Sequence, residues 1–280
     1  MTKKKILIIG KNGLISSQIF DYLKRKKSLI VKQISFNQLN QKNLKLDKIN
    51  YIINCASNKN FVNKSYNSNA DFDYLIAQKI REFDTRLIII STRKIYKPGK
   101  NLKENSKKLL NSNYSRNKFL SEINIKNTLK KNYLILRLPN LLCLRIKKCS
   151  RKLHKTYLDL FIEKIDKGIM IDNGKIYKDF LPIEIFCKIV LKLINIDASG
   201  IYNVSIGKKV FLNKLNSWLN FYNKNQSKLL KVPFEKNKSL NQDAFYLNNS
   251  KLLKKINIKL GLTDIKKSSI KISKKIFNEK

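Results

Sequence analysis

Lys5-Ile6-Leu7-Ile8-Ile9-Gly10-Lys11-Asn12-Gly13-Leu14-Ile15-Ser16 is the most informative segment of this 280-residue chain. Its apolar run over residues 5–9 has no polar alternation, which predicts a strand buried on both faces. Gly10 and Gly13 turn the chain, and the apolar residues that follow keep helical spacing (Ile15, Ile19, Tyr22 and Leu23). Glycines there let the backbone approach a pyrophosphate, and the helix N-terminus supplies unpaired N–H groups. The segment therefore predicts a phosphate-binding turn, with an ordinary tight strand–helix turn as the alternative.

Strands and helices alternate after this unit. Further strands are predicted over 29–36, 51–56, 87–91 and 133–137, and the run over 87–91 is again almost entirely apolar. Helical spacing predicts helices over about 70–83 and 114–130. Such alternation is typical of a parallel, doubly wound sheet. Right-handed crossovers place the loops after the strands along one binding edge. We therefore predict an α/β fold of the Rossmann type.

The alternation loosens beyond residue 140. Helices are predicted over 158–167, 182–194 and 213–222, with short strands over 175–181 and 200–204. The last stretch, about 228–280, is rich in Lys and Asn but keeps Leu252, Leu253, Ile256 and Ile258. We expect residues 1–140 plus about 175–205 to form the Rossmann domain. Residues of about 141–174 and 206–280 would then form a small C-terminal substrate lobe.

The net charge of +41, from 60 Lys+Arg against 19 Asp+Glu, needs an explanation. With 42% hydrophobic residues the chain is too apolar for a disordered polycation. Nucleic acid or an anionic membrane surface would attract such a charge. However, 52 of the basic residues are Lys and only 8 are Arg, and they are spread over the whole chain. Proteins that bind bases and phosphates favour the guanidinium group of Arg over Lys. We therefore attribute the charge to a compositional bias, and nucleic-acid binding is disfavoured.

Cysteine and histidine usage argues against metal and disulfide chemistry. The four cysteines, none in a C-x-x-C pair, are Cys55, Cys143, Cys149 and Cys187. We expect no metal site and a reducing compartment. The single histidine, His154, stands in a basic segment and is interpreted as an isolated surface residue. The longest apolar span, Tyr133 to Leu144, is too short for a membrane helix. No signal-peptide pattern precedes the first strand. Together these observations predict a cytoplasmic protein.

Two further segments carry side chains suited to proton transfer. Tyr114 and Lys118 are four residues apart at the start of a predicted helix, so they lie on one helical face. There an ammonium can stabilise a phenolate, whose unperturbed pKa is about 10, and a phenol so tuned can exchange a proton with a sugar hydroxyl or ketone. Ser91-Thr92, at the end of a buried strand, could hydrogen-bond the same oxygen. Taken singly, Tyr-x-x-x-Lys also arises by chance in a Lys-rich chain, and Ser-Thr is also an ordinary strand end.

In this order the motifs resemble the extended short-chain dehydrogenase/reductase superfamily, specifically its NAD-dependent epimerase/dehydratase group. The resemblance covers most of the chain. It rests on Gly10-Lys11-Asn12-Gly13, Asn54-Cys55-Ala56-Ser57, Ser91-Thr92-Arg93-Lys94-Ile95-Tyr96, Tyr114-x-x-x-Lys118 with Glu122, Leu136-Arg137-Leu138-Pro139-Asn140, Lys178-Asp179-Phe180-Leu181-Pro182-Ile183-Glu184 and Gly200-Ile201-Tyr202-Asn203-Val204.

The resemblance implies a nicotinamide cofactor, NAD or NADP, and a nucleotide-activated sugar between the lobes. Tyr114 would be the acid/base, Lys118 would hold the nicotinamide ribose and favour the Tyr phenolate, and Thr92 would be the catalytic hydroxyl. The implied cofactor contacts are Gly10, Asn12, Gly13, Leu14, Ile15, Cys55, Ala56, Ser57, Tyr114 and Lys118, and the implied substrate contacts are Ser91, Arg93 and Asn140. Asn69 matches a family Asn more loosely. The resemblance also allows a homodimer.

Departures from the family pattern narrow the reaction. Sugar-nucleotide 4,6-dehydratases carry an Asp-Glu pair after the catalytic Thr, whereas Arg93 and Lys94 stand here, so dehydration is disfavoured. A 4-keto-sugar reductase or a 4-epimerase remains, and the Gly10 segment favours the deoxysugar reductases slightly. Ser16 replaces the usual third glycine and is expected to loosen helix–strand packing or shift the cofactor. Residues 34–37 lack both the acid that would hold an NAD ribose and an Arg for NADP.

We therefore predict an NAD(P)-dependent oxidoreductase or epimerase that acts on a nucleotide sugar for surface-polysaccharide synthesis. Two alternatives stay open. One is an atypical family member that binds RNA, with the lysines as its phosphate contacts. The other is a scaffold that holds cofactor without catalysis.

Overall fold

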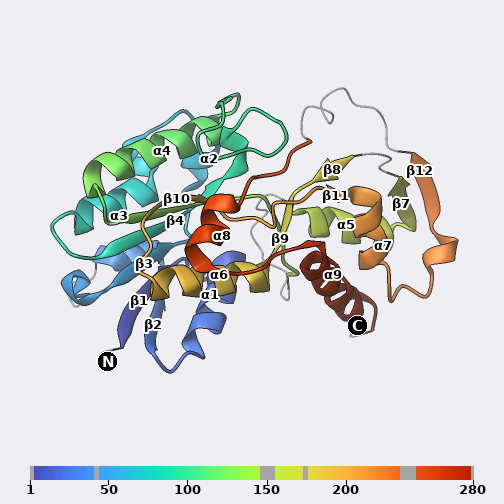
Figure 1. Cartoon of the computed structure of the whole chain (residues 1–280), viewed down its shortest axis with the longest axis horizontal. Coiled ribbons are helices and arrows are strands. Elements are labelled where there is room, and N and C mark those ends of the chain that lie inside the picture. Colours follow the sequence, from blue (N-terminus) through green and yellow to red (C-terminus); the bar gives the residue numbers. More distant parts are fainter. Residues whose placement is uncertain (1–2, 41–43, 146–154, 173–175, 234–243, 279–280) are drawn as a thin grey trace. The chain divides into compact units, whose positions relative to one another are not determined.

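Strands predicted from the sequence form one parallel sheet in the computed structural model (Figure 1). The structure describes residues 3–40, 44–145, 155–172, 176–233 and 244–278. The strands are β1 (Lys4–Ile9), β2 (Leu29–Ile34), β3 (Tyr51–Asn54), β4 (Arg86–Thr92), β5 (Tyr133–Leu138) and β10 (Gly200–Asn203). Their order is β10-β5-β4-β3-β1-β2, and every neighbouring pair is parallel. The predicted Rossmann-type, doubly wound α/β fold is confirmed.

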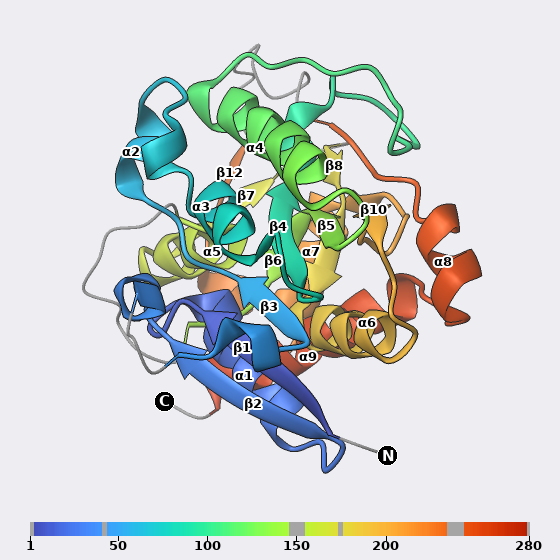
Figure 2. The same cartoon turned by 90° about the vertical axis from the view of Figure 1, so that its left-hand side faces the viewer.

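Helices cover both faces of this sheet (Figures 1 and 2). α3 (Phe72–Ile80) and α4 (Asn113–Leu129) lie over one face, and α1 (Leu14–Lys24) and α6 (Ile183–Asn195) lie over the other. The connections between strands and helices contain the short helix α2 (Lys59–Asn63) and the 3₁₀ turns η1 (Phe36–Asn40), η2 (Leu46–Lys48), η3 (Ser68–Ala70) and η4 (Arg93–Ile95). Because both faces are covered, the central strands β1, β3, β4 and β5 have continuous buried apolar runs, whereas in the edge strand β2 exposed residues alternate with buried or half-buried ones.

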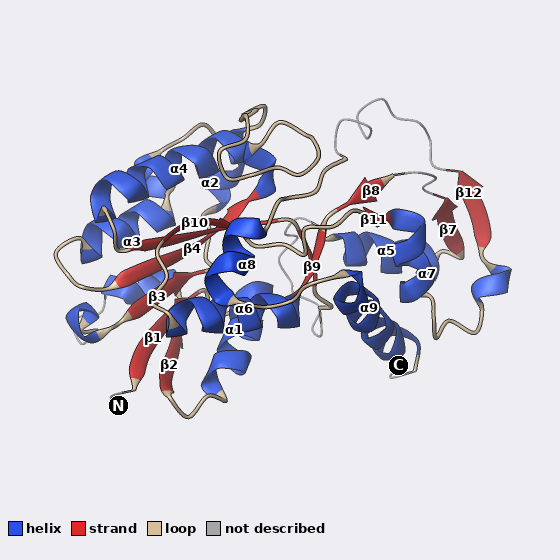
Figure 3. Cartoon of the chain, in the orientation of Figure 1, coloured by secondary structure: helices blue, strands red, loops and turns tan. Residues whose placement is uncertain are grey.

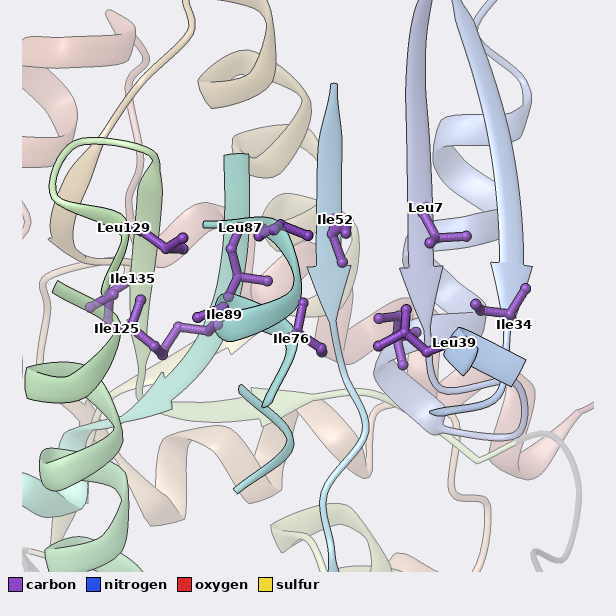
Figure 4. Close-up of a cluster of buried hydrophobic side chains, with 13 residues drawn as sticks. Leu7, Ile34, Leu39, Ile52, Ile76, Leu87, Ile89, Ile125, Leu129 and Ile135 are labelled. Carbon is purple, nitrogen blue, oxygen red and sulfur yellow. The ribbon is translucent and has the colours of Figure 1, made fainter. Parts of the chain in front are cut away.

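Buried apolar side chains pack the sheet against α3 and α4 (Figure 4). Alternate strand residues point to this face and meet apolar residues of the two helices. The cluster includes Leu7, Ile9, Ile52, Leu87, Ile89 and Ile135 from the strands and Ile76, Ile125 and Leu129 from the helices. All of these side chains are buried.

Local capping fixes where the two helices begin. The Asp71 carboxylate accepts the N–H of Tyr74 at 3.1 Å, so α3 starts at Phe72 rather than at residue 70 as predicted. Ser112 and Ser115 form a reciprocal capping box at the start of α4. This cap sets the first turn of α4, which carries Tyr114.

The order of the strands reverses between β1 and β3, because the chain crosses back over β1 after completing β2. Loops that leave two such strands at their carboxyl ends diverge and open a crevice, which is where ligands bind in sheets of this kind. Gly10 follows β1 and Cys55 follows β3. The topology therefore brings two of the predicted cofactor segments to the switch point.

By its internal contacts the chain divides into two units. The first comprises Met1–Lys97, Glu104–Leu138 and Glu184–Val204, and contains the sheet just described. The second comprises Pro98–Lys103, Pro139–Ile183 and Ser205–Lys280. None of the helices within the described ranges has the length and apolar character needed to cross a bilayer.

The second unit combines short strand pairs with helices (Figure 3). The strand pairs are β6 (Asn140–Leu142) with β9 (Phe180–Pro182), β7 (Ile169–Asp172) with β12 (Leu230–Pro233), and β8 (Tyr177–Lys178) with β11 (Val210–Phe211). The helices are α5 (Tyr157–Asp166), α7 (Leu212–Leu219), α8 (Ser250–Ile256) and α9 (Leu262–Phe277), with the turn η5 (Gln226–Lys228).

One expectation for this part of the chain was wrong. The single strand predicted over 175–181 is two short strands, β8 and β9, with the buried Asp179 between them; residue 175 itself lies outside the described residues. The Asp179 carboxylate accepts the backbone N–H of Leu247 at 3.0 Å, so the chain is tied down where a continuous strand would pass. The C-terminal stretch, for which no element was predicted, forms α8 and α9.

Candidate functional site

The turn after β1 has the backbone that a phosphate-binding loop requires. Gly10 has φ +124°, a conformation that side-chain-bearing residues rarely adopt. A Cβ on Gly10 would lie 3.3 Å from the backbone N of Ala56, so a side chain would also crowd the turn after β3. Gly13 is the N-cap of α1 and provides no side-chain cap. The first N–H groups of α1 are therefore presented to a ligand.

Ser16 tightens this turn instead of loosening it as expected. Its side chain is fully buried, and its hydroxyl lies within hydrogen-bonding distance of the carbonyl oxygens of Gly10 and Gly13, the latter at 2.9 Å. A Cβ on Gly13 would come within 2.8 Å of the Ser16 Oγ. The hydroxyl thus occupies the space left by the turn, and this position of Ser16 requires glycine at position 13.

The turn after β3 is shaped by the buried side chain of Asn54. Its Oδ1 accepts the N–H of Ala56 at 3.0 Å, and its Nδ2 donates to the carbonyl of Ala56 at 3.2 Å. The same Nδ2 donates to the Asp73 carboxylate at 2.6 Å. Burial, together with the charge of Asp73, raises the pKa of the Cys55 thiol, so this cysteine is a neutral part of the turn rather than a nucleophile.

Tyr114 and Lys118 lie on successive turns of α4. Lys118 is only 7% exposed, and its Nζ donates to the Asp73 carboxylate at 2.9 Å. Burial alone would lower the pKa of Lys118, but the charge of Asp73 holds the pKa above its usual range. Lys118 is therefore an ammonium one helical turn from the half-buried Tyr114.

The turn η4, which follows β4, places Lys94 over the ring of the same tyrosine. Thr92 caps the turn η4, and its Oγ1 accepts the N–H of Lys94 at 3.2 Å. The exposed Lys94 places its Nζ 5.9 Å from the centroid of the Tyr114 ring. Because Oγ1 accepts in the cap, the hydroxyl keeps its own hydrogen for donation to a different acceptor.

These contacts join the predicted residues of the first unit into one chain of neighbours. The Gly10 turn touches the Asn54–Ala56 turn, whose Asn54 binds Asp73, and Asp73 binds Lys118. Lys118 lies one turn of α4 from Tyr114, and the ring of Tyr114 lies under the Lys94 ammonium. Asn12 and Ser57 are exposed in their turns, and Leu14 and Ile15 are half-buried in α1. Asn69 is exposed in η3.

Two predicted substrate contacts face the interior. Ser91 is buried and donates its hydroxyl hydrogen to the Glu122 carboxylate, and Arg93 is 9% exposed. Asn140 belongs to the second unit, where it starts β6 and its Nδ2 donates to the carbonyl of Asp179 at 3.3 Å. His154 and Cys149 lie outside the described residues, within which no cluster of His, Cys, Asp or Glu could hold a metal ion.

A buried ion pair lies behind Ser91. The Arg137 guanidinium donates to the Glu122 carboxylate from Nε at 3.0 Å and from Nη2 at 2.5 Å. Its Nη1 donates to the Tyr96 hydroxyl and to the Glu104 carbonyl, each at 2.8 Å. The pair thus connects β5, α4, η4 and the end of β4.

Sequence reasoning missed Asp73, the residue that joins the two cofactor segments. One signal could have found it: Asp73 shares a predicted helix with Ile76, Ala77 and Ile80, and a carboxylate on an apolar helix face has to find a partner. The partner itself could not be read, because Lys118 is 45 residues away in the sequence.

Comparison with known proteins shows the family and the fold of the chain. Residues 6–205 match the model of the NAD dependent epimerase/dehydratase family. No curated protein matches the chain. Among solved structures, the UDP-N-acetylglucosamine 4-epimerase of Methanobrevibacter ruminantium, in complex with UDP-N-acetylmuramic acid, is similar over 100% of both chains, with TM-score 0.78 and 20% identity.

Two further structures have the same fold. A dTDP-4-dehydrorhamnose reductase of Clostridium acetobutylicum has TM-score 0.71 and 16% identity, over 96% of this chain and 98% of its own. The dTDP-glucose 4,6-dehydratase of Bacillus anthracis, in complex with NAD, has TM-score 0.73 and 14% identity, over 99% of this chain and 97% of its own. At such identities the likeness shows a shared fold and does not choose among the three reactions.

Proposed function

This chain belongs to the NAD-dependent epimerase/dehydratase family, and on that premise we propose that it is an NAD(P)-dependent enzyme acting on a nucleotide-activated sugar, as a 4-keto-sugar reductase or a 4-epimerase. The observation that carries the proposal is the chain of contacts from the Gly10 turn through the Asn54–Ala56 turn and Asp73 to Lys118, which lies one helical turn from Tyr114. These contacts support a site in which the Gly10 turn would bind a dinucleotide and Tyr114 with Lys118 would transfer a proton.

The residues of the first unit fit a dinucleotide. The space beside Gly10, which a Cβ would fill, lets the backbone approach a pyrophosphate, and the uncapped start of α1 offers N–H donors to it. Leu14 and Ile15 would lie beside the same phosphates, and the turn at Cys55, Ala56 and Ser57 would flank the cofactor. The Lys118 ammonium would bind the nicotinamide ribose. When bound, the nicotinamide supplies or accepts the hydride.

Three side chains would act on the sugar. Tyr114 would exchange a proton with the oxygen on the reacting carbon. Thr92 would donate its hydroxyl hydrogen to the same oxygen, which is compatible with its role as acceptor in the η4 cap. Lys118 would stabilise the phenolate between turnovers, because its ammonium remains charged in its buried position.

The positions after Thr92 favour hydride transfer without dehydration. Arg93 and Lys94 carry no group that could remove a proton from carbon as a carboxylate base does. A 4-keto-sugar reductase and a 4-epimerase are the two reactions that need only hydride and proton transfer. We assign Asn140 and the second unit to substrate binding, and surface-polysaccharide synthesis as the process served.

Tyr114→Phe tests the proposal. Removing a positioned acid/base typically lowers the rate by about 10²–10⁴-fold, so kcat should fall by that factor while the dissociation constant for NAD(H) changes little. Tyr133→Phe, at the start of β5, is the matched control and should keep full activity. Candidate substrates come from mass spectrometry of the sugar nucleotides that copurify with the protein.

The assay also separates the two reactions. A reductase consumes NAD(P)H in proportion to product, whereas an epimerase turns over with a catalytic amount of bound NAD⁺. Unchanged turnover of every accepted sugar nucleotide in Tyr114→Phe would refute the assignment.

A further inference from the structure

A buried carboxylate lies between the two cofactor segments. Asp73 is 4% exposed on α3, in a helix whose other buried residues are Ile76, Ala77 and Ile80. Its Oδ1 accepts from Asn54 Nδ2 at 2.6 Å and its Oδ2 accepts from Lys118 Nζ at 2.9 Å. A charge removed from water in this way is stable only when it is paired and hydrogen-bonded. Each oxygen of Asp73 therefore has its own partner.

The two partners belong to different parts of the candidate site. Asn54 holds the turn after β3 through both its amide atoms and Ala56. Lys118 carries the ammonium that would bind the nicotinamide ribose. An ammonium has three N–H donors, so the bond to Asp73 leaves two for the ribose hydroxyls. Asp73 thus links the position of Lys118 to the position of the β3 turn.

We propose that Asp73 is a positioning residue for cofactor binding: it keeps Lys118 charged, fixes its ammonium against the turn after β3, and so aligns the two surfaces that hold the nicotinamide ribose. This inference rests on the proposed function. Asp73 would be the carboxylate that stabilises the Lys118 ammonium, in addition to the three predicted catalytic residues Thr92, Tyr114 and Lys118.

Among the charged and titratable groups around Lys118, Asp73 is the one that most favours its charged form. Asp73 and Asp71 face Lys118 from α3, Tyr114 faces it from the preceding turn of α4, and the Cys55 thiol faces it from the loop after β3. The Lys118 ammonium also lies 5.6 Å from the centroid of the Phe61 ring. Burial favours the neutral amine, and the charge of Asp73 is the largest influence that opposes it.

The neighbouring Asp71 offers a matched control. It is also buried and caps the start of the same helix, but its carboxylate accepts from the Tyr66 hydroxyl at 2.9 Å, the Ser121 hydroxyl at 3.0 Å and the Tyr74 N–H at 3.1 Å. Asn is a good helix N-cap, so Asp71→Asn keeps the start of α3. The control therefore removes one buried negative charge close to Lys118 without removing its hydrogen-bond partner.

The experiment measures the dissociation constant of NADH and NADPH by calorimetry from pH 7 to pH 10, in the full-length wild type, Asp73→Asn and Asp71→Asn. Asn has the shape of Asp and keeps an oxygen near Lys118, and circular dichroism checks that each variant is folded. Asp73→Asn should weaken binding by roughly tenfold or more, because a charge-assisted hydrogen bond is lost. The weakening should grow with pH as Lys118 loses its proton, while wild type and Asp71→Asn stay nearly constant.

Each result decides the question. Wild-type affinity with the same pH profile in Asp73→Asn would overturn the inference and leave the proposed function intact. An equal loss in Asp71→Asn would also overturn it, since the effect would then be general to the charge of α3. If wild type itself binds neither dinucleotide, the proposed function fails and the inference fails with it.

Discussion

Replacing Glu122 by Gln should destabilise the protein far more than an ordinary surface substitution. Arg137 is 3% exposed and Glu122 is 1% exposed, and two guanidinium nitrogens bond the carboxylate at 3.0 and 2.5 Å. Gln preserves the shape of Glu but leaves a guanidinium charge buried without a counterion. Removing one partner of such a pair typically lowers the free energy of unfolding by about 3–5 kcal/mol.

The expected loss lies at the lower end of that range, about 3 kcal/mol, because Gln keeps one oxygen acceptor and Arg137 keeps two others. These are the Tyr96 hydroxyl and the Glu104 carbonyl, each at 2.8 Å. For a chain of this size the loss corresponds to a fall in Tm of about 6–12 °C. The double variant Glu122→Gln/Arg137→Met removes the stranded charge as well. It should therefore lose less stability than the two single variants added together.

The assay is thermal and urea unfolding followed by far-UV circular dichroism, on wild type, both single variants and the double variant. Glu163→Gln on α5 is the control, because Glu163 pairs with Lys155 at an exposed site. Solvent screens such a pair, and the unfolding midpoint should stay at the wild-type value. An unchanged midpoint in Glu122→Gln, or a double variant that loses the full sum of the single losses, would refute the reasoning.

Two further predictions concern other buried contacts. Ser16→Ala should lower the free energy of unfolding by about 1 kcal/mol and weaken NAD(H) binding, because the hydroxyl that bonds the Gly10 turn is lost. Urea unfolding measures the first quantity and calorimetry the second. Unchanged values would show that the hydroxyl contributes to neither. Burial and the charge of Asp73 raise the pKa of Asp71 from 3.8 to about 6. Since the folded-state pKa lies above the unfolded one, this contribution to stability is fully present below about pH 4 and is lost as the pH rises through about 6. Between these pH values wild type should therefore lose stability relative to Asp71→Asn, by up to about 3 kcal/mol, and a Tm difference that is constant with pH would contradict this.

The sequence was most informative where a local pattern and the fold agree. Continuous apolar runs predicted β1, β3, β4 and β5, because a strand covered on both faces needs no polar residue. It was least informative in the second unit, whose paired strands span two to four residues and are too short for a period to show. Helix α9 was missed because lysines interrupt its apolar residues, although Ile265, Ile272 and Ile276 are buried along one face.

For the candidate site, the sequence alone determined the types of chemistry and the order of the groups: a glycine turn after the first strand, a hydroxyl at the end of the fourth strand, and Tyr114 with Lys118 one helical turn apart. These are local features, set by backbone conformation and by the helical period. Only the tertiary structure decided which buried charges are paired. Asp73 meets Lys118, and Glu122 meets Arg137, because the crossovers of the sheet bring α3, α4 and β5 together. No spacing along the chain encodes those distances, since they depend on how helices pack over a sheet whose strand order differs from the order in sequence.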